Sequence, residues 1–269
     1  MPKVTVNDRQ IYYQETGSGP ETVVFSHGYL MRHDMFADQI AALSSTYRVI
    51  SFDHRGHGES DRSRDPFGIY DLVDDAAGLI DQICEGPVHF AGMSTGGYVG
   101  VRLLLRRPDL IKTMTLIDTS AGAEPPETIK GQKFLLFLVW LFGLRPLVFL
   151  VMPKLFGKTT RNDPAKRSVL RKWKTYIGGL DGESIRQFGF AIFARDDVLD
   201  DLRAVSEPAP TLIVVGDEDV PTPVNAARQT HDAIVGSKLV IVPESGHSSP
   251  VEKPDIVTKA MADFLAQVD

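Results

Sequence analysis

The chain has 269 residues, of which 43% are hydrophobic and 24% charged, and its formal net charge is −6 with a pI near 5.7. This composition is that of a globular protein long enough to bury a large core. The acidic balance argues against nucleic acid as the main partner, because phosphate backbones are bound by basic surfaces.

The cysteine content and the first residues indicate the compartment. Cys84 is the single cysteine, so no disulfide can form within the chain, which fits a reducing environment. The opening residues, MPKVTVNDRQ, lack the apolar core of a signal peptide and begin like a strand. We therefore expect a cytoplasmic protein.

Strands are predicted first at residues 3–8 and 10–17, as a hairpin that turns at Asn7-Asp8. Further short runs of apolar and β-branched residues follow at 22–26, 47–53, 87–92, 112–118, 209–216 and 237–244. Runs that are apolar on both faces belong in a mostly parallel sheet covered by helices on both sides. We expect an α/β fold with eight strands.

Helical patterns alternate with these strands, at residues 35–45, 70–84, 96–109 and 253–268. The alternation fails between residues 122 and 208, where no strong strand run occurs and the patterns are helical. A helical insertion in a βα series most simply covers the carboxyl edge of the sheet. We expect a core domain of residues 1–121 and 209–269 and a helical cap of residues 122–208.

The most apolar part of this insertion, residues 134–152, is nearly long enough to span a bilayer. Gly143, Arg145 and Pro146 lie together at its middle. Proline interrupts a helix, and arginine is costly at mid-bilayer. We expect two short apolar helices joined by a GLRP turn, and no stable membrane span.

A strand-to-helix junction carries the strongest functional motif, Gly92-Met93-Ser94-Thr95-Gly96, which is G-x-S-x-G. Ser94 must sit on a tight, strained turn, and the glycines leave room for neighbouring elements. The serine then stands at the amino end of a helix, whose dipole favours developing negative charge. The motif predicts a nucleophilic serine.

Four motifs in order carry a family resemblance: HGY (27–29), FDHRGHGES (52–60), GMSTGG (92–97), and GDEDVPTP with SGHSSPVEKP near the end. The chain resembles capped α/β-hydrolases of the serine esterase, 3-oxoadipate enol-lactonase and cofactor-free haloperoxidase type. The resemblance spans nearly the whole chain outside the cap. It implies no cofactor and no metal.

Acyl transfer needs two backbone N–H donors for the oxyanion. One should be the amide of Thr95, directly after the nucleophile. The resemblance places the other at Tyr29, with Gly28 letting the loop pass close to the site. In the family, the histidine at position 27 mostly braces this loop.

The general base is expected at His247, which follows a strand and precedes the last helix. Gly246 gives this loop freedom, and the chain order Ser, acid, His is that of α/β-hydrolases. His54 and His57 could suggest a metal site with Asp53. The segment is better explained as the family's glycine-rich loop.

The acid that holds the imidazole is expected at Asp219, three residues beyond Gly216, where the family places it. Thr222 should cap the following helix. Asp118, which ends an earlier strand, and Asp217 remain alternatives.

Together these residues predict a serine hydrolase that cleaves small to medium apolar esters or lactones through an acyl-enzyme. A perhydrolase or haloperoxidase, a C–C bond hydrolase, or a small-ligand receptor would keep the same residues. Candidate pocket residues are Gly28, Met93, Phe134, Leu138, Trp140, Phe142 and Val220. Packing of the cap onto the core is the alternative role for most of the cap residues.

Overall fold

The computed structural model describes residues 2–268. Its strands form one sheet in the order β1-β2-β4-β3-β5-β6-β7-β8. They are β1 (Lys3–Val6), β2 (Arg9–Thr16), β3 (Thr22–Ser26), β4 (Arg48–Phe52), β5 (Val88–Met93), β6 (Ile111–Ile117), β7 (Thr211–Gly216) and β8 (Lys238–Val242). The β1–β2 and β2–β4 pairs are antiparallel and all others are parallel. The predicted eight-stranded, mostly parallel sheet is confirmed.

The turn between β1 and β2 lies where the sequence places it. Asn7 and Asp8 have φ angles of 49° and 60°. A two-residue hairpin turn needs positive φ at both central positions, and Asn and Asp accept this backbone better than other non-glycine residues. The local chemistry of these two residues is therefore enough to close the hairpin.

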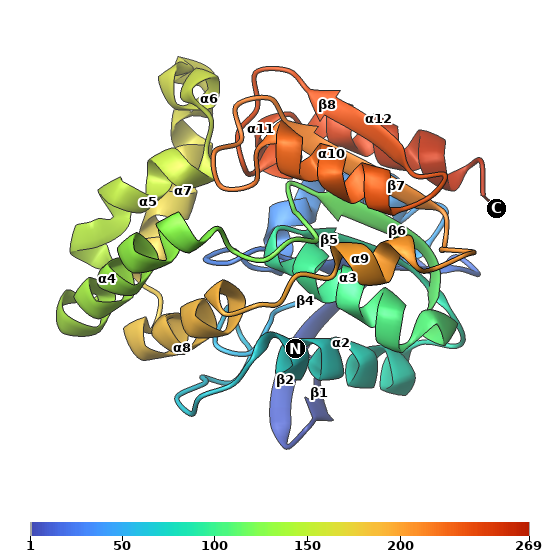
Figure 1. Cartoon of the computed structure of the whole chain (residues 1–269), viewed down its shortest axis with the longest axis horizontal. Helices are drawn as coiled ribbons and strands as arrows, with labels where there is room; N and C mark the ends of the chain where they lie inside the picture. Colours follow the sequence, from blue (N-terminus) through green and yellow to red (C-terminus); the bar gives the residue numbers. More distant parts are fainter. Residues whose placement is uncertain (1, 269) are drawn as a thin grey trace.

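Helices cover both faces of the sheet (Figure 1). The helices of the sheet-forming part are α1 (Ala37–Leu43), α2 (Ile69–Ile83), α3 (Thr95–Arg106), α10 (Val224–Ala233), α11 (Ser249–Glu252) and α12 (Pro254–Leu265), with 3-10 turns η1 (His33–Phe36) and η2 (Pro108–Leu110). Side chains of α2, α3 and α10 pack with one set of strand residues, and those of α1 and α12 with another.

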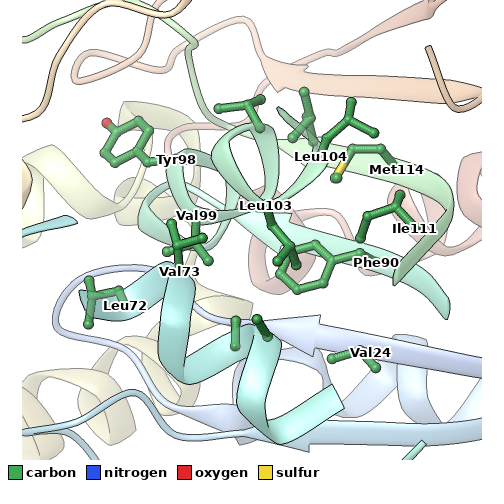
Figure 2. Packing of buried hydrophobic residues seen from close by; sticks show 14 of the residues in the cluster. Val24, Leu72, Val73, Phe90, Tyr98, Val99, Leu103, Leu104, Ile111 and Met114 are labelled. Atoms are coloured by element: carbon green, nitrogen blue, oxygen red, sulfur yellow. The ribbon is translucent and has the colours of Figure 1, made fainter. Parts of the chain in front are cut away.

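Alternation along the strands produces these two cores. Val24 joins the core beneath α2 and α3, whereas its neighbours Val23 and Phe25 join the core beneath α12. Figure 2 shows Phe90 of β5 among side chains of α2 and α3, including Val73 and Leu103. A strand that is apolar at every position is thus buried on both faces, which is why the runs read as continuous.

Between β6 and β7 the described elements are all helical. They are α4 (Pro126–Phe142), η3 (Arg145–Leu147), α5 (Val148–Leu155), α6 (Lys158–Asn162), η4 (Pro164–Lys166), α7 (Arg167–Gly178), α8 (Gly182–Phe193) and α9 (Leu199–Arg203). Helices α4 to α8 gather at the end of the molecule away from the C-terminus (Figure 1). We propose that this insertion is a cap.

The apolar stretch within the insertion is divided as predicted. Gly143 ends α4 with a φ angle of 71°, and a 3-10 turn at Arg145–Leu147 leads into α5. Among the described residues, none of the helices combines the length and the hydrophobicity that crossing a membrane requires.

Candidate active site

Ser94 lies on a strained turn between the end of β5 and the start of α3. Its backbone has φ 50° and ψ −110°, a region that non-glycine residues rarely occupy. The turn is held by hydrogen bonds from the Ser94 amide to the Ile117 carbonyl (2.9 Å) and from Thr119 Oγ1 to the Ser94 carbonyl (2.7 Å). Backbone strain of this kind, fixed by its surroundings, is typical of functional sites.

Two glycines make this turn sterically feasible. A Cβ on Gly92 would lie 2.2 Å from the Gly96 carbonyl oxygen, and a Cβ on Gly96 would lie 2.0 Å from the Ser26 carbonyl oxygen of β3. Both distances are far inside van der Waals contact. Both glycines of G-x-S-x-G are therefore needed because backbone atoms of neighbouring segments lie where a side chain would be.

Ser94, His247 and Asp219 form one buried chain of hydrogen bonds. The Ser94 Oγ lies 2.9 Å from His247 Nε2, and His247 Nδ1 lies 2.9 Å from Asp219 Oδ2 and 3.0 Å from Oδ1. The Ser94 and His247 residues are each 5% exposed, and the Asp219 side chain is fully buried. A serine, an imidazole and a carboxylate in this order match the geometry of nucleophile, base and orienting acid.

The environment of His247 sets its protonation behaviour. Burial disfavours the imidazolium, but the charge of Asp219 and its hydrogen bond outweigh this effect, so the pKa of His247 is raised above its usual 6.5. Asp219 also fixes the tautomer, because a carboxylate can only accept from Nδ1–H. The proton-free Nε2 then faces Ser94.

The alternative acids have other partners. Asp118 is fully buried and accepts from the amides of Gly216 (2.9 Å) and Ser249 (2.8 Å), so it ties the end of β7 to the loop that follows His247. Burial and the nearby charge of Asp219 raise the pKa of Asp118 to about 7. Asp217 is exposed. Neither carboxylate hydrogen-bonds to His247 within residues 2–268.

The turn after β7 corrects the expected role of Thr222. Thr222 does not cap α10, because the N-cap residue is Pro223. Thr222 donates instead to Asp219 through both its amide (2.9 Å) and its hydroxyl (2.8 Å). Glu218 accepts from the Thr159 amide of α6 at 2.8 Å. The turn therefore both orients the acid and contacts the insertion.

Two amides stand beside Ser94 as candidate oxyanion donors. Thr95 is the first residue of α3, where a backbone N–H has no intrahelical acceptor. In the opposite loop, the Leu30 amide donates to His57 Nε2 and the Met31 amide donates to the Gly28 carbonyl. The Tyr29 amide, in contrast, donates no hydrogen bond within residues 2–268. Gly28 faces the site closely, since a Cβ there would lie 3.2 Å from Ser94 Cβ.

His27 connects this loop to the loop after β4 through hydrogen bonds. Its Nε2 accepts from the His54 amide (2.9 Å), which leaves Nδ1 to donate to the Gly28 carbonyl (2.8 Å). Burial lowers the pKa of His27 to about 4, so the ring is neutral at pH 7 and both contacts persist. These two hydrogen bonds hold the Gly28–Tyr29 loop in place, as expected from the resemblance.

The aspartate and the histidines of the loop after β4, which were considered above as a metal site, hydrogen-bond to other groups of the protein. His54 Nε2 pairs with Ser26 Oγ at 2.9 Å, and burial lowers the pKa values of His54 and His57. Asp53 accepts from the amide and the Nδ1 of His33, each at 2.8 Å. His33 thus anchors the start of the loop after β4.

Helix α8 covers the candidate site, a contribution that the sequence analysis did not assign. Tyr29 donates from its hydroxyl to the Ile185 carbonyl (2.8 Å), and its ring stacks on Phe188 with centroids 5.6 Å apart. Gly189 allows the approach, because a Cβ there would lie 3.0 Å from the Tyr29 hydroxyl. The apolar pattern around residues 185–193 was the signal that could have predicted this cover.

A second group of residues near Ser94 also escaped the sequence analysis. The Arg195 guanidinium lies 4.0 Å from the ring centroid of Tyr98, and its Nη1 pairs with Glu124 at 2.8 Å. Burial raises the pKa of Tyr98. The charge of Arg195 and a hydrogen bond with the Ser94 side chain lower it, but burial outweighs them. These residues come from three separate segments of the chain, so no local motif predicts that they lie together.

The predicted pocket residues divide into two sets. Gly28 and Met93 lie at the site and are buried. Phe134, Trp140 and Phe142 are instead 62%, 59% and 60% exposed, and Val220 is 70% exposed. Leu138 is half-buried against cap and core residues. An acyl-pocket role for the exposed residues is not supported, because Leu136 and Val139 are the α4 side chains that turn inward.

Comparisons with known proteins agree with this geometry. The family model described as "alpha/beta hydrolase fold" matches residues 21–254. The acetyltransferase component of the acetoin cleaving system of Pseudomonas putida is 29% identical over 260 residues, which cover 94% of this chain and 66% of that protein. A non-heme haloperoxidase of Rhodococcus erythropolis is 28% identical over a match that covers 98% of this chain and 99% of the haloperoxidase.

Among solved structures, the enol-lactonase from Burkholderia xenovorans superposes with a TM-score of 0.90 at 28% identity, over 98% of this chain and 100% of that one. The predicted resemblance to enol-lactonases and haloperoxidases is confirmed. With a family match over most of its length, a mixed eight-stranded sheet and a serine at the strained β5–α3 turn, the chain belongs to the α/β hydrolase fold family.

Proposed function

We propose that this protein is a serine hydrolase that cleaves carboxylic esters or lactones of small to medium apolar substrates through an acyl-enzyme. One observation carries the proposal: Ser94 Oγ and Asp219 Oδ2 each lie 2.9 Å from opposite nitrogens of the His247 ring. A serine beside a base that is itself oriented by a carboxylate is the arrangement that activates a weak nucleophile. The solved enol-lactonase, which acts on a cyclic ester, supports the bond type.

The first half of the reaction forms the acyl-enzyme. His247 Nε2 removes the Ser94 Oγ proton while the oxygen attacks the ester carbonyl carbon. Asp219 stabilises the imidazolium that results, because it is fully buried and already paired with Nδ1. Collapse of the tetrahedral intermediate transfers the Nε2 proton to the leaving alkoxide, which departs as the alcohol.

The second half regenerates the enzyme. His247 deprotonates a water molecule that attacks the acyl carbon, and the proton returns to Ser94 Oγ as the acid leaves. In both halves the amides of Tyr29 and Thr95 donate to the carbonyl oxygen as it becomes negative. The dipole of α3 adds positive potential at the same place.

Substrate preference is proposed from the surroundings of the site. Met93, Tyr29 and Phe188 provide apolar surface, and α8 closes the site from the insertion. The preference for apolar acyl groups rests on this lining and not on the exposed rings of α4.

The test is hydrolysis of p-nitrophenyl acetate, butyrate and octanoate by the wild type and by Ser94→Ala. We expect the variant to lose at least about 10³-fold in kcat/KM, because removal of a nucleophile leaves only binding and oxyanion stabilisation. An alkyl phosphonate probe should add its mass to the peptide containing Ser94. Ser45→Ala, which alters an exposed serine just after the end of α1, is the matched control and should react like the wild type. Retained turnover in Ser94→Ala, or none in either protein, would refute the proposal.

A second candidate activity is perhydrolysis, which the 28% identical haloperoxidase supports. Hydrogen peroxide would replace water in the second half and release a peracid, with the Ser94 proton restored as before. Bromination of monochlorodimedone in acetate buffer with peroxide and bromide measures this activity. It should depend on Ser94 as hydrolysis does.

A further inference from the structure

The outer face of α4 and α5 carries a group of exposed apolar side chains. They are Phe134, Phe137, Trp140, Leu141, Phe142, Phe149 and Leu150, exposed by between 42% and 66%. We call these seven residues the apolar cap face. Single exposed apolar residues are ordinary, but a contiguous group on one surface marks an interaction site.

The aromatic side chains at its centre lie together, and they are not the side chains that hold α4 to the molecule. The rings of Phe137 and Trp140 have centroids 6.0 Å apart, and both line a surface groove of about 280 Å³ with Phe190 of α8. The α4 residues that hold the helix to the molecule are Leu136 and Val139, which are 2% and 3% exposed. The exposed rings therefore contribute little to folding and need another explanation.

The charge of the surrounding surface identifies the kind of partner. Residues 126–180, which begin with α4, contain eleven Lys and Arg and two carboxylates, Glu127 and Asp163, so this segment has a formal net charge of +9. Because the whole chain carries −6, the remaining residues carry −15. Six of the cations lie on or directly beside α4, α5 and α6 and are exposed, namely Lys130, Lys133, Arg145, Lys154, Lys158 and Arg161.

Rings and cations on the same surface match an anionic lipid bilayer. Aromatic and leucine side chains insert at the headgroup level, and flanking Lys and Arg side chains reach the lipid phosphates. Each cation near an anionic membrane strengthens binding by about fivefold. The acidic remainder of the chain would be repelled from the same surface, which fixes the orientation.

The geometry points to one arrangement. We propose that the apolar cap face docks on an anionic membrane surface, with α4 and α5 lying in the interface plane and no segment crossing. Helices α4 and α5 lie at the extremity of the molecule (Figure 1). Behind α4, Leu136 packs close to Gly189 of α8, which in turn meets Tyr29. Docking would therefore bring the cover of the candidate active site next to the lipid.

The two tryptophans allow a direct test on the whole protein. Trp140 belongs to the apolar cap face and is 59% exposed, whereas Trp173 is 1% exposed and serves as an internal constant. We expect flotation with vesicles of phosphatidylcholine and phosphatidylglycerol at low salt, and little with phosphatidylcholine alone. Trp140 emission should shift to the blue on binding, and brominated acyl chains should quench it.

Two variants and two controls separate rings from charges. Phe134→Ser with Phe142→Ser should weaken partitioning about tenfold or more. Lys133→Glu with Lys154→Glu should weaken it by at least about 25-fold, about fivefold for each cation lost, and should reduce its salt dependence. Val235→Ser and Lys259→Glu, which alter exposed residues outside the face, should bind like the wild type. Ser94→Ala should also bind normally, so failure of the proposed chemistry and failure of docking are distinguishable.

Three results would overturn the proposal. One is the absence of binding to anionic vesicles at low salt. Another is equal binding of the cap variants and the controls. The third is a Trp140 blue shift that grows with protein concentration without lipid, together with a dimer in light scattering, because a second copy would then cover the face.

Discussion

Replacing Asp219 by Asn tests whether Asp219, and not its buried neighbour Asp118, is the acid that orients His247. The Asp219 carboxylate accepts three hydrogen bonds, from His247 Nδ1 and from the amide and hydroxyl of Thr222. An amide group has a single oxygen, so in Asp219→Asn an N–H faces one of these donors. If it faces His247, the ring must carry its proton on Nε2 and can no longer accept one from Ser94.

The expected loss follows from this wrong tautomer. Substitution of a triad aspartate by asparagine with the geometry intact lowers kcat by about 10⁴-fold in serine proteases. At 1.36 kcal/mol for each factor of ten, a loss of about 10³- to 10⁴-fold corresponds to roughly 4–5 kcal/mol of transition-state stabilisation. Because Asp219 is fully buried, we expect a loss in this range.

Asp118→Asn is the matched control, since Asp118 is also fully buried and lies beside the same histidine loop. Its two oxygens accept from the amides of Gly216 and Ser249, and the variant can keep only one of these bonds. We expect about 1–3 kcal/mol lower unfolding free energy. Burial and the charge of Asp219 raise the pKa of Asp118 to about 7. The Asp118 carboxyl is therefore only partly ionised at neutral pH, and its replacement by Asn removes only part of a charge. The rate should fall by about tenfold or less.

The assay is kcat/KM for p-nitrophenyl butyrate with urea unfolding of each variant measured in parallel. A loss below tenfold in Asp219→Asn would refute the assignment of Asp219. An equal or larger loss in Asp118→Asn, with a fold as stable as that of Asp219→Asn, would transfer the role of acid to Asp118.

The remaining predictions concern pH and the nucleophile turn. Since Asp219 outweighs burial and raises the pKa of His247, kcat/KM should fall as the pH drops through an apparent pKa above 6.5, and a profile with its midpoint below 6.5 would contradict this. The same pair contributes stability that is fully present below pH 6.5 and is lost as the pH rises through the folded pKa, which thermal melts across this window can measure. Gly96→Ala should destabilise the fold by roughly 3 kcal/mol or more, because its Cβ would lie 2.0 Å from the Ser26 carbonyl oxygen. Gly131→Ala in α4, where nothing lies within 4 Å, should raise the unfolding free energy by about 0.5–1 kcal/mol; similar urea midpoints for the two variants would show that the packing argument is wrong.

Much of the fold follows from local patterns. Strands such as β3 are apolar on both faces, and this continuous pattern both marks their position and predicts burial between two helix layers. The junction at Ser94 is also local, because strand, glycine, serine, glycine and helix are neighbours in the chain. Asp219 and His247 were identified through the resemblance and their order in the chain, and their contact at 2.9 Å is a property of the folded protein.

The errors share a physical cause. Thr222 has the side chain of a helix cap, but the buried carboxylate of Asp219 competes for its hydroxyl and amide. Phe134 and Trp140 are apolar and were expected to line a pocket, yet a helix has two faces and the sequence of α4 is apolar on both. In such a helix the periodicity of apolar residues does not predict which face is buried. The buried face is instead set by the packing of Leu136 and Val139 against α8.

Local sequence patterns were enough to predict the strands, the two helix layers, the strained serine turn and the helical character of the insertion, because each depends on residues adjacent in the chain. The folded protein was needed to show which carboxylate hydrogen-bonds to His247, which helix packs on Tyr29, and which face of α4 meets solvent. These are contacts between residues such as Asp118 and Ser249, 131 positions apart, whose distance depends on the packing of the whole sheet.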